Sequence, residues 1–142
     1  MNNVLTKWQQ WAPNLRSILR IVAAFMFMQA GTMKLFSFPV GMPPGAGPLK
    51  LLSEIGIAGI LETFGGALLL LGLFTRPVAF ILSGEMAVAY FQAHFPHSFW
   101  TIVNGGQAAV FYCFAFLYLS AAGPGPWSVD AVVQKKQSNS QT

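Results

Sequence analysis

Charged residues are scarce in this chain of 142 residues. Only 8% are Asp, Glu, Lys or Arg, whereas 54% are hydrophobic. Ordinary soluble domains contain roughly 25% charged residues, so this sequence has too few to cover a surface that faces water. The composition indicates an integral membrane protein. The net charge of +4 does not indicate nucleic-acid binding, because the cations are scattered and lie near the ends of apolar runs.

Cysteine and histidine are scarcer still. Cys113 is the only cysteine, and His94 and His97 are the only histidines. One cysteine excludes a disulfide within the chain, a Cys-x-x-Cys redox pair, a haem-attachment motif and an iron–sulfur ligand set. Pro96 lies between the two histidines and disfavours a regular helical pair, so we expect no metal site. The sequence also lacks a Ser-His-Asp set, a phosphate loop and a dinucleotide fingerprint.

The chain does contain long apolar runs. Each is roughly 20 residues long, which is enough for a helix to cross a bilayer core of about 30 Å. They predict four spans, at about residues 17–38, 53–73, 77–95 and 100–122. The predicted fold class is therefore all-α, a four-helix transmembrane bundle that occupies residues 16–132.

The two ends of the chain are polar. In residues 1–15, Leu5, Trp8, Trp11 and Ala12 are spaced to share one face of a helix, which predicts a short cytoplasmic segment at the membrane interface. Residues 133–142 read as a polar cytoplasmic tail, in which we expect disorder from Gln134 to Thr142.

The cations are distributed unevenly between the two sides of the predicted bundle. Four spans place both termini on one side, together with Lys7, Arg16, Arg20, Arg76, Lys135 and Lys136, whereas Lys34 and Lys50 lie on the other. Cytoplasmic segments carry the excess of Lys and Arg. We therefore expect a multi-pass protein of a bacterial-type inner membrane with both termini in the cytoplasm. All four tryptophans fall at predicted interfaces, as an aromatic belt requires.

Two acids and two bases fall within the predicted spans: Arg20, Lys34, Glu62 and Glu85. An ionised side chain near the bilayer midplane is costly unless it is paired, neutral or hydrated, so we predict an intramembrane polar centre. Three readings stay open: an ion-paired network that fixes helix packing, a polar cavity for a ligand or a proton path, and snorkelling of the bases towards the interfaces. Gly56, Gly59 and Gly66 give the second span a small face for close packing.

Other polar residues are weaker candidates. Lys50 and Glu54 are four residues apart, which predicts a surface ion pair of modest strength. The candidate ligand-binding residues are Phe27, Gln92, Asn104 and Gln107. The aromatic residues of the fourth span read as packing, although aromatics could also line a quinone site.

Several of these segments together resemble the DoxX family of small four-helix membrane proteins. The resemblance rests on Arg20 with Gly31-x-x-Lys34-Leu35, on Glu62-x-x-Gly65-Gly66 running to Thr75-Arg76-Pro77, on Glu85-Met86, and on Asn104-Gly105-Gly106 with the segment 123–130. Gln107 departs from the pattern, because many relatives carry an acid after Asn-Gly-Gly. Some family members are similar to the membrane subunit of a thiosulfate–quinone oxidoreductase, and others associate with redox-defence proteins.

The resemblance implies a membrane subunit or accessory of a redox system that interacts with a quinone, with no covalently bound cofactor. One alternative is a small transporter or proton-conducting protein. Another is a non-catalytic membrane scaffold for a soluble oxidoreductase. The expected partners are the lipid bilayer, a soluble or membrane-bound oxidoreductase and further copies of the chain, and no nucleic acid is expected.

The charge distribution makes a testable prediction about topology. A phosphatase reporter that is active only in the periplasm should be silent when it is fused after Asp130, because that end of the chain is cationic. The same reporter should be active when it is inserted in the loop at residues 39–48. The reverse pattern of activities would contradict the predicted orientation.

Overall fold

The computed structural model describes residues 2–45, 47 and 49–140. Every regular element in this part of the chain is a helix and none is a strand, which confirms the all-α class. Its long helical segments are α1 (Asn2–Phe36), α2 (Glu54–Ile60) continuing through the π-helical η1 (Leu61–Gly65) into α3 (Gly66–Leu71), α4 (Thr75–Ala89) with the π-helical η2 (Tyr90–His94), and α6 (Gln107–Ala122). The short ones are η3 (Phe95–His97), α5 (Thr101–Asn104) and α7 (Val129–Asn139).

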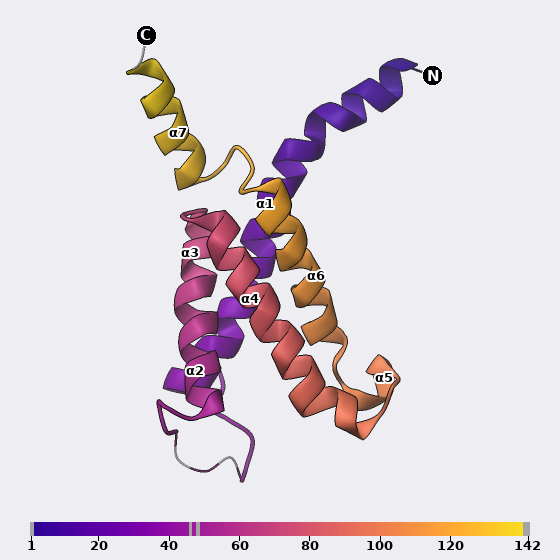
Figure 1. The fold of residues 1–142 in the computed structure, drawn as a ribbon, viewed down its shortest axis with the longest axis vertical. Helices are drawn as coiled ribbons and strands as arrows, with labels where there is room; N and C mark the ends of the chain where they lie inside the picture. The colour runs from indigo at the N-terminus through magenta and orange to yellow at the C-terminus, as the bar shows by residue number, and fades with distance from the viewer. Residues whose placement is uncertain (1, 46, 48, 141–142) are drawn as a thin grey trace.

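The bundle consists of two closely packed pairs of segments. α1 packs along α2, η1 and α3, and α4 packs along α6 (Figure 1). The two pairs meet in a small apolar core that contains Phe27, Leu69, Leu82 and Phe116. The loop after α1 lies at one end of the bundle, and α7 lies with the start of α1 at the other end.

Two helices of the described chain are long and apolar enough to cross a membrane, Val4–Phe36 and Glu54–Leu71. The helix at 107–122 is apolar but shorter, and it begins later than the predicted fourth span at 100–122. Gly105 explains this difference. It adopts the left-handed conformation with φ of 71° and ends α5, so the helix restarts only at Gln107.

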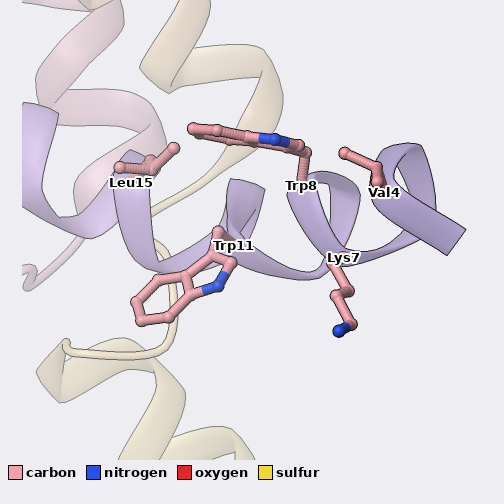
Figure 2. A pocket seen from close by; sticks show the side chains of 5 residues that line it. All are labelled: Val4, Lys7, Trp8, Trp11 and Leu15. Atoms are coloured by element: carbon pink, nitrogen blue, oxygen red, sulfur yellow. The ribbon is translucent and has the colours of Figure 1, made fainter.

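The N-terminal segment differs from the prediction of a separate helix at residues 1–15. α1 runs without interruption through Pro13, and its 35 residues make it about 50 Å long, well beyond a bilayer core of about 30 Å. Its first part projects from the bundle (Figure 1). Trp8 and Trp11 are more than half exposed there, and the Trp8 ring reaches towards Leu15 (Figure 2).

The C-terminal segment is more ordered than the sequence suggested. α7 extends to Asn139, so the expectation of disorder from Gln134 is wrong for the helical part. Residues 141–142 lie outside the described residues. The hydroxyl of Ser128 accepts a hydrogen bond of 3.2 Å from the Ala131 N–H. It caps the first turn of the helix, where serine is preferred.

The expected Lys50–Glu54 ion pair is not formed in the described ranges. α2 begins only at Glu54, with Ser53 as its N-cap. Lys50 therefore lies in the preceding turn, where a spacing of four residues does not bring two side chains to one helical face.

The close contact of α1 with η1 generates a prediction about stability. A Cβ at Gly31 would lie 2.8 Å from Glu62 Cβ and would also collide with Thr63. Gly31→Ala should therefore lower the free energy of unfolding by about 1–3 kcal/mol, since overpacking forces neighbouring groups apart. Thermal melting in detergent measures the effect.

Gly84→Ala is the matched control, because a Cβ at Gly84 would meet no atom within 4 Å. Its melting temperature should equal or exceed that of the parent, since alanine favours the helix. Equal melting of the Gly31 and Gly84 variants would contradict the close approach of α1 and η1.

Candidate functional site

Lys34 and Glu62 form an ion pair inside the bundle. Lys34 lies in the last turn of α1, and Glu62 lies in η1, near the middle of the second helical segment. The Lys34 ammonium donates a hydrogen bond of 2.6 Å to Glu62 Oε1 and another to Oε2. Only 4% of the Glu62 side chain is exposed, against 21% of the Lys34 side chain. The pair therefore approaches the surface through its lysine.

Glycines allow the backbones that carry this pair to approach each other. Gly31 faces Glu62, and a Cβ at Gly59 would lie 3.2 Å from Lys34 Cβ. Gly66 faces Met28 in the same way. The prediction that small residues of the second span serve close packing is confirmed at Gly59 and Gly66. Glu62 itself sits in a π-helical turn, a local widening of the helix that is frequent at functional sites.

Glu85 approaches the same pair from α4. Both of its carboxyl oxygens are buried and have no hydrogen-bond partner among the residues that the structure describes. Glu62 and Lys34 are both within electrostatic reach of this carboxyl group. The structure thus brings three of the four predicted charged residues together, and we call Lys34, Glu62 and Glu85 the acid–lysine cluster.

Tyr112 is a neighbour of this cluster that sequence reasoning missed. It lies in α6 within electrostatic reach of Glu62, and its ring packs 5.2 Å from Phe27 and 5.6 Å from Phe116, measured between centroids. Aromatic residues occur on all sides of α6, so nothing in the sequence distinguishes Tyr112 from those that only pack.

Arg20 lies apart from the acid–lysine cluster, which corrects the prediction of a single polar centre. Its side chain is fully buried and donates hydrogen bonds to the carbonyls of Leu69 at 2.5 Å, Leu70 at 2.7 Å and Pro124 at 2.9 Å, and also to that of Trp127. Leu69 is about 10 Å from Glu62 along the helix axis. Arg20 thus binds two carbonyls in the last turn of α3, of which that of Leu69 also accepts a hydrogen bond of 3.1 Å from the Gly72 N–H.

Two more arginines bind backbone carbonyls at the same end of the bundle. Arg16 donates a hydrogen bond of 2.8 Å to the Ala122 carbonyl, and Arg76 donates to the carbonyls of Ser120 and Ala121 at the end of α6. The carboxylate of Asp130 accepts hydrogen bonds of 2.9 Å from the backbone N–H groups at the start of α4. We call Arg16, Arg20, Arg76 and Asp130 the capping cluster, because each binds backbone groups at helix ends.

The four predicted ligand-binding residues do not meet. Phe27 is buried in the aromatic core, and Gln92 is exposed on η2. The side chain of Asn104 stabilises the turn before α6. It donates a hydrogen bond of 2.8 Å to the Ser98 carbonyl and accepts one of 2.7 Å from the Gly106 N–H. Gln107 lines an apolar groove beside α6. None of the four has a described contact with the acid–lysine cluster.

The DoxX family profile matches residues 15–95, which is more than half of the chain. The chain belongs to the DoxX family. This confirms the resemblance, and the matched range contains Arg20 and all three residues of the acid–lysine cluster. α6 and Asp130 lie beyond it.

Individual relatives support membrane localisation of this DoxX protein. It is 42% identical to an uncharacterized protein of Haemophilus influenzae, over 96% of this chain and 100% of the relative. It is 26% identical to the uncharacterized membrane protein Rv3486 of Mycobacterium tuberculosis, over 83% of this chain and 80% of the relative. It is also 26% identical to the inner membrane protein YqjF of Escherichia coli, over 84% of this chain and 92% of the relative. No solved structure matches the chain.

The ion pair of this DoxX protein generates a prediction about charge. Glu62→Gln should be tolerated better than Glu62→Lys, because the latter places two ammonium groups together in a buried position. The double variant Lys34→Glu with Glu62→Lys should recover part of the lost melting temperature, since it restores opposite charges. Melting of the purified variants in detergent measures both effects.

Glu54→Lys is the control, because Glu54 is an exposed acid at the start of the same helical segment. It should melt close to the parent. If Glu62→Lys expresses and melts like the parent, the pair does not support the fold.

Proposed function

We propose that this DoxX protein is a membrane subunit or accessory of a redox system and that its acid–lysine cluster interacts with a quinone headgroup. The observation that supports this most is the carboxyl group of Glu85, which lies within electrostatic reach of the Lys34–Glu62 ion pair. Both of its oxygens are buried and have no hydrogen-bond partner among the described residues. A purely structural ion pair needs one acid, whereas this bundle places a second acid within electrostatic reach of the same lysine.

The number of charged groups in the cluster favours the binding of one proton. With both acids ionised and one lysine present, the cluster carries one net negative charge in a buried environment. Binding one proton makes it neutral, and a neutral cluster is less costly to bury than a charged one. Glu62 and Glu85 are therefore suited to holding a proton and to releasing it when the charge nearby changes.

The residues of the cluster match the needs of a quinone. A quinone, when bound, supplies two-electron chemistry that is coupled to proton uptake. The ammonium of Lys34 is a donor for a carbonyl oxygen, the carboxyl groups of Glu62 and Glu85 hold protons, and Tyr112 adds an aromatic ring and a hydroxyl. The electrons must come from a partner or a diffusible carrier, because the chain has one cysteine and two histidines.

The same proposal includes the placement of the protein. We place it in the inner membrane with four crossings and with the capping cluster on the cytoplasmic side. Three arginines at that end accord with the excess of cations in cytoplasmic segments. The name of the E. coli relative, an inner membrane protein, supports the choice of membrane.

A short-chain quinone analogue tests the proposed function. It should raise the melting temperature of the purified parent protein, because a ligand that binds only the folded state stabilises it. Glu62→Gln and Glu85→Gln should each reduce that rise, whereas Glu54→Gln, which changes an exposed acid, should retain it. The melting temperature of each variant without ligand shows that it is folded.

The absence of a quinone effect on folded parent protein would contradict the quinone interaction. Co-purification with an oxidoreductase in that case would identify the protein as a scaffold. If Glu54→Gln reduces the quinone-induced rise in melting temperature as much as Glu62→Gln and Glu85→Gln do, the effect is not specific to the cluster.

A further inference from the structure

A polar cavity of about 420 Å³ opens at the end of the bundle opposite the capping cluster. It lies where α1 ends and where the loop that leads to α2 folds back. Its lining includes Lys34, Ser37, Met42, Leu49, Lys50 and Ser53. Two lysines and two serines are thus gathered at one opening.

Two lysines line the cavity, and among the described residues only the charge of Lys34 is balanced by an ion pair. The described lining of the cavity contains no acid. Glu62 pairs with Lys34 from the inner side, but Lys50 has no ion-pair partner in the described ranges, since its expected pair with Glu54 is not formed. An ammonium group that lines a cavity without a carboxylate attracts an anion.

The backbone holds Lys50 in place at this opening. The Lys50 carbonyl accepts hydrogen bonds of 2.9 Å from the Ser53 N–H and 2.6 Å from the Ser53 hydroxyl. The same serine caps α2 through the Gly56 N–H at 3.2 Å. The backbone of the turn that carries Lys50 is therefore tied to the start of α2.

We propose that this cavity binds an oxyanion of the phosphate or sulfate type between Lys34 and Lys50. Each ammonium offers up to three donors, and the Ser37 hydroxyl offers another. The oxyanion is either a free ion or the phosphate of a lipid headgroup. Because Lys34 also binds Glu62, an anion in the cavity competes with Glu62 for the same ammonium. The cavity thereby couples the surface of the bundle to the acid–lysine cluster.

The first test uses the full chain in neutral detergent and sodium sulfate at millimolar concentration, against sodium chloride at equal ionic strength. The parent should show a saturable rise in melting temperature with sulfate. Lys50→Gln should lose that rise and Lys50→Arg should keep it, because arginine retains the charge and the donors. Lys7→Gln, an exposed lysine at the far end of α1, should respond like the parent.

The second test separates the two sources of the oxyanion. The protein is placed in nanodiscs of phosphatidylglycerol or of phosphatidylcholine without added sulfate, and melting is compared for the parent and Lys50→Gln. A stabilisation by phosphatidylglycerol that requires Lys50 identifies the headgroup as the ligand. A Lys50-dependent rise with sulfate, without a Lys50-dependent effect of phosphatidylglycerol, identifies a free ion.

The proposal is overturned if neither test shows a dependence on Lys50. A rise with sulfate that is equal in the parent and in Lys50→Gln would count against it in the same way, because sulfate stabilises many proteins through exclusion from their surfaces. The probe is not a quinone, so failure of this binding and failure of the proposed redox role are distinguishable.

Discussion

The ion pair between Lys34 and Glu62 can form only because two backbones approach closely beside it. Gly31 gives η1 room against α1, and Gly59 gives α2 room against the last turn of α1. A larger residue at either position would separate the two helical segments and leave a carboxylate and an ammonium apart in a buried environment. Close packing of the helices and formation of the ion pair therefore depend on each other in this half of the bundle. Glu85, in α4 of the other half, lies within electrostatic reach of the pair.

The two ends of the bundle use charge differently. At the end that carries the capping cluster, arginine and aspartate side chains bind backbone groups, so the charges close helix termini and leave little for a ligand to contact. At the opposite end, Lys34 and Lys50 line a cavity, and Lys34 pairs with the Glu62 side chain. The charges at one end thus contact the backbone, whereas those at the other end contact side chains and a cavity.

Much of the fold could be predicted from the sequence, because apolar runs, glycine and proline mark helices and their limits directly. Glu62 and Glu85 could be singled out because acids are rare in such runs. The partners of the charges could not be predicted from patterns alone. Arg20 binds carbonyls, which every residue possesses, so no residue type in the sequence marks its partners. The approach of Lys34 to Glu62, across 28 positions of sequence, depends on the register between two helices.

The contact of Asp130 with the start of α4 also bears on the order in which the protein assembles. The backbone groups that it binds belong to residues 55 and 56 positions earlier in the chain. During synthesis, α1, α2, α3 and α4 all emerge before the residue that completes the first turn of α4. The two backbone N–H groups therefore lack this partner until residue 130 has been made. Binding of these N–H groups by Asp130 is thus a late event in the assembly of the bundle. A chain truncated before residue 130 lacks the carboxylate that binds them.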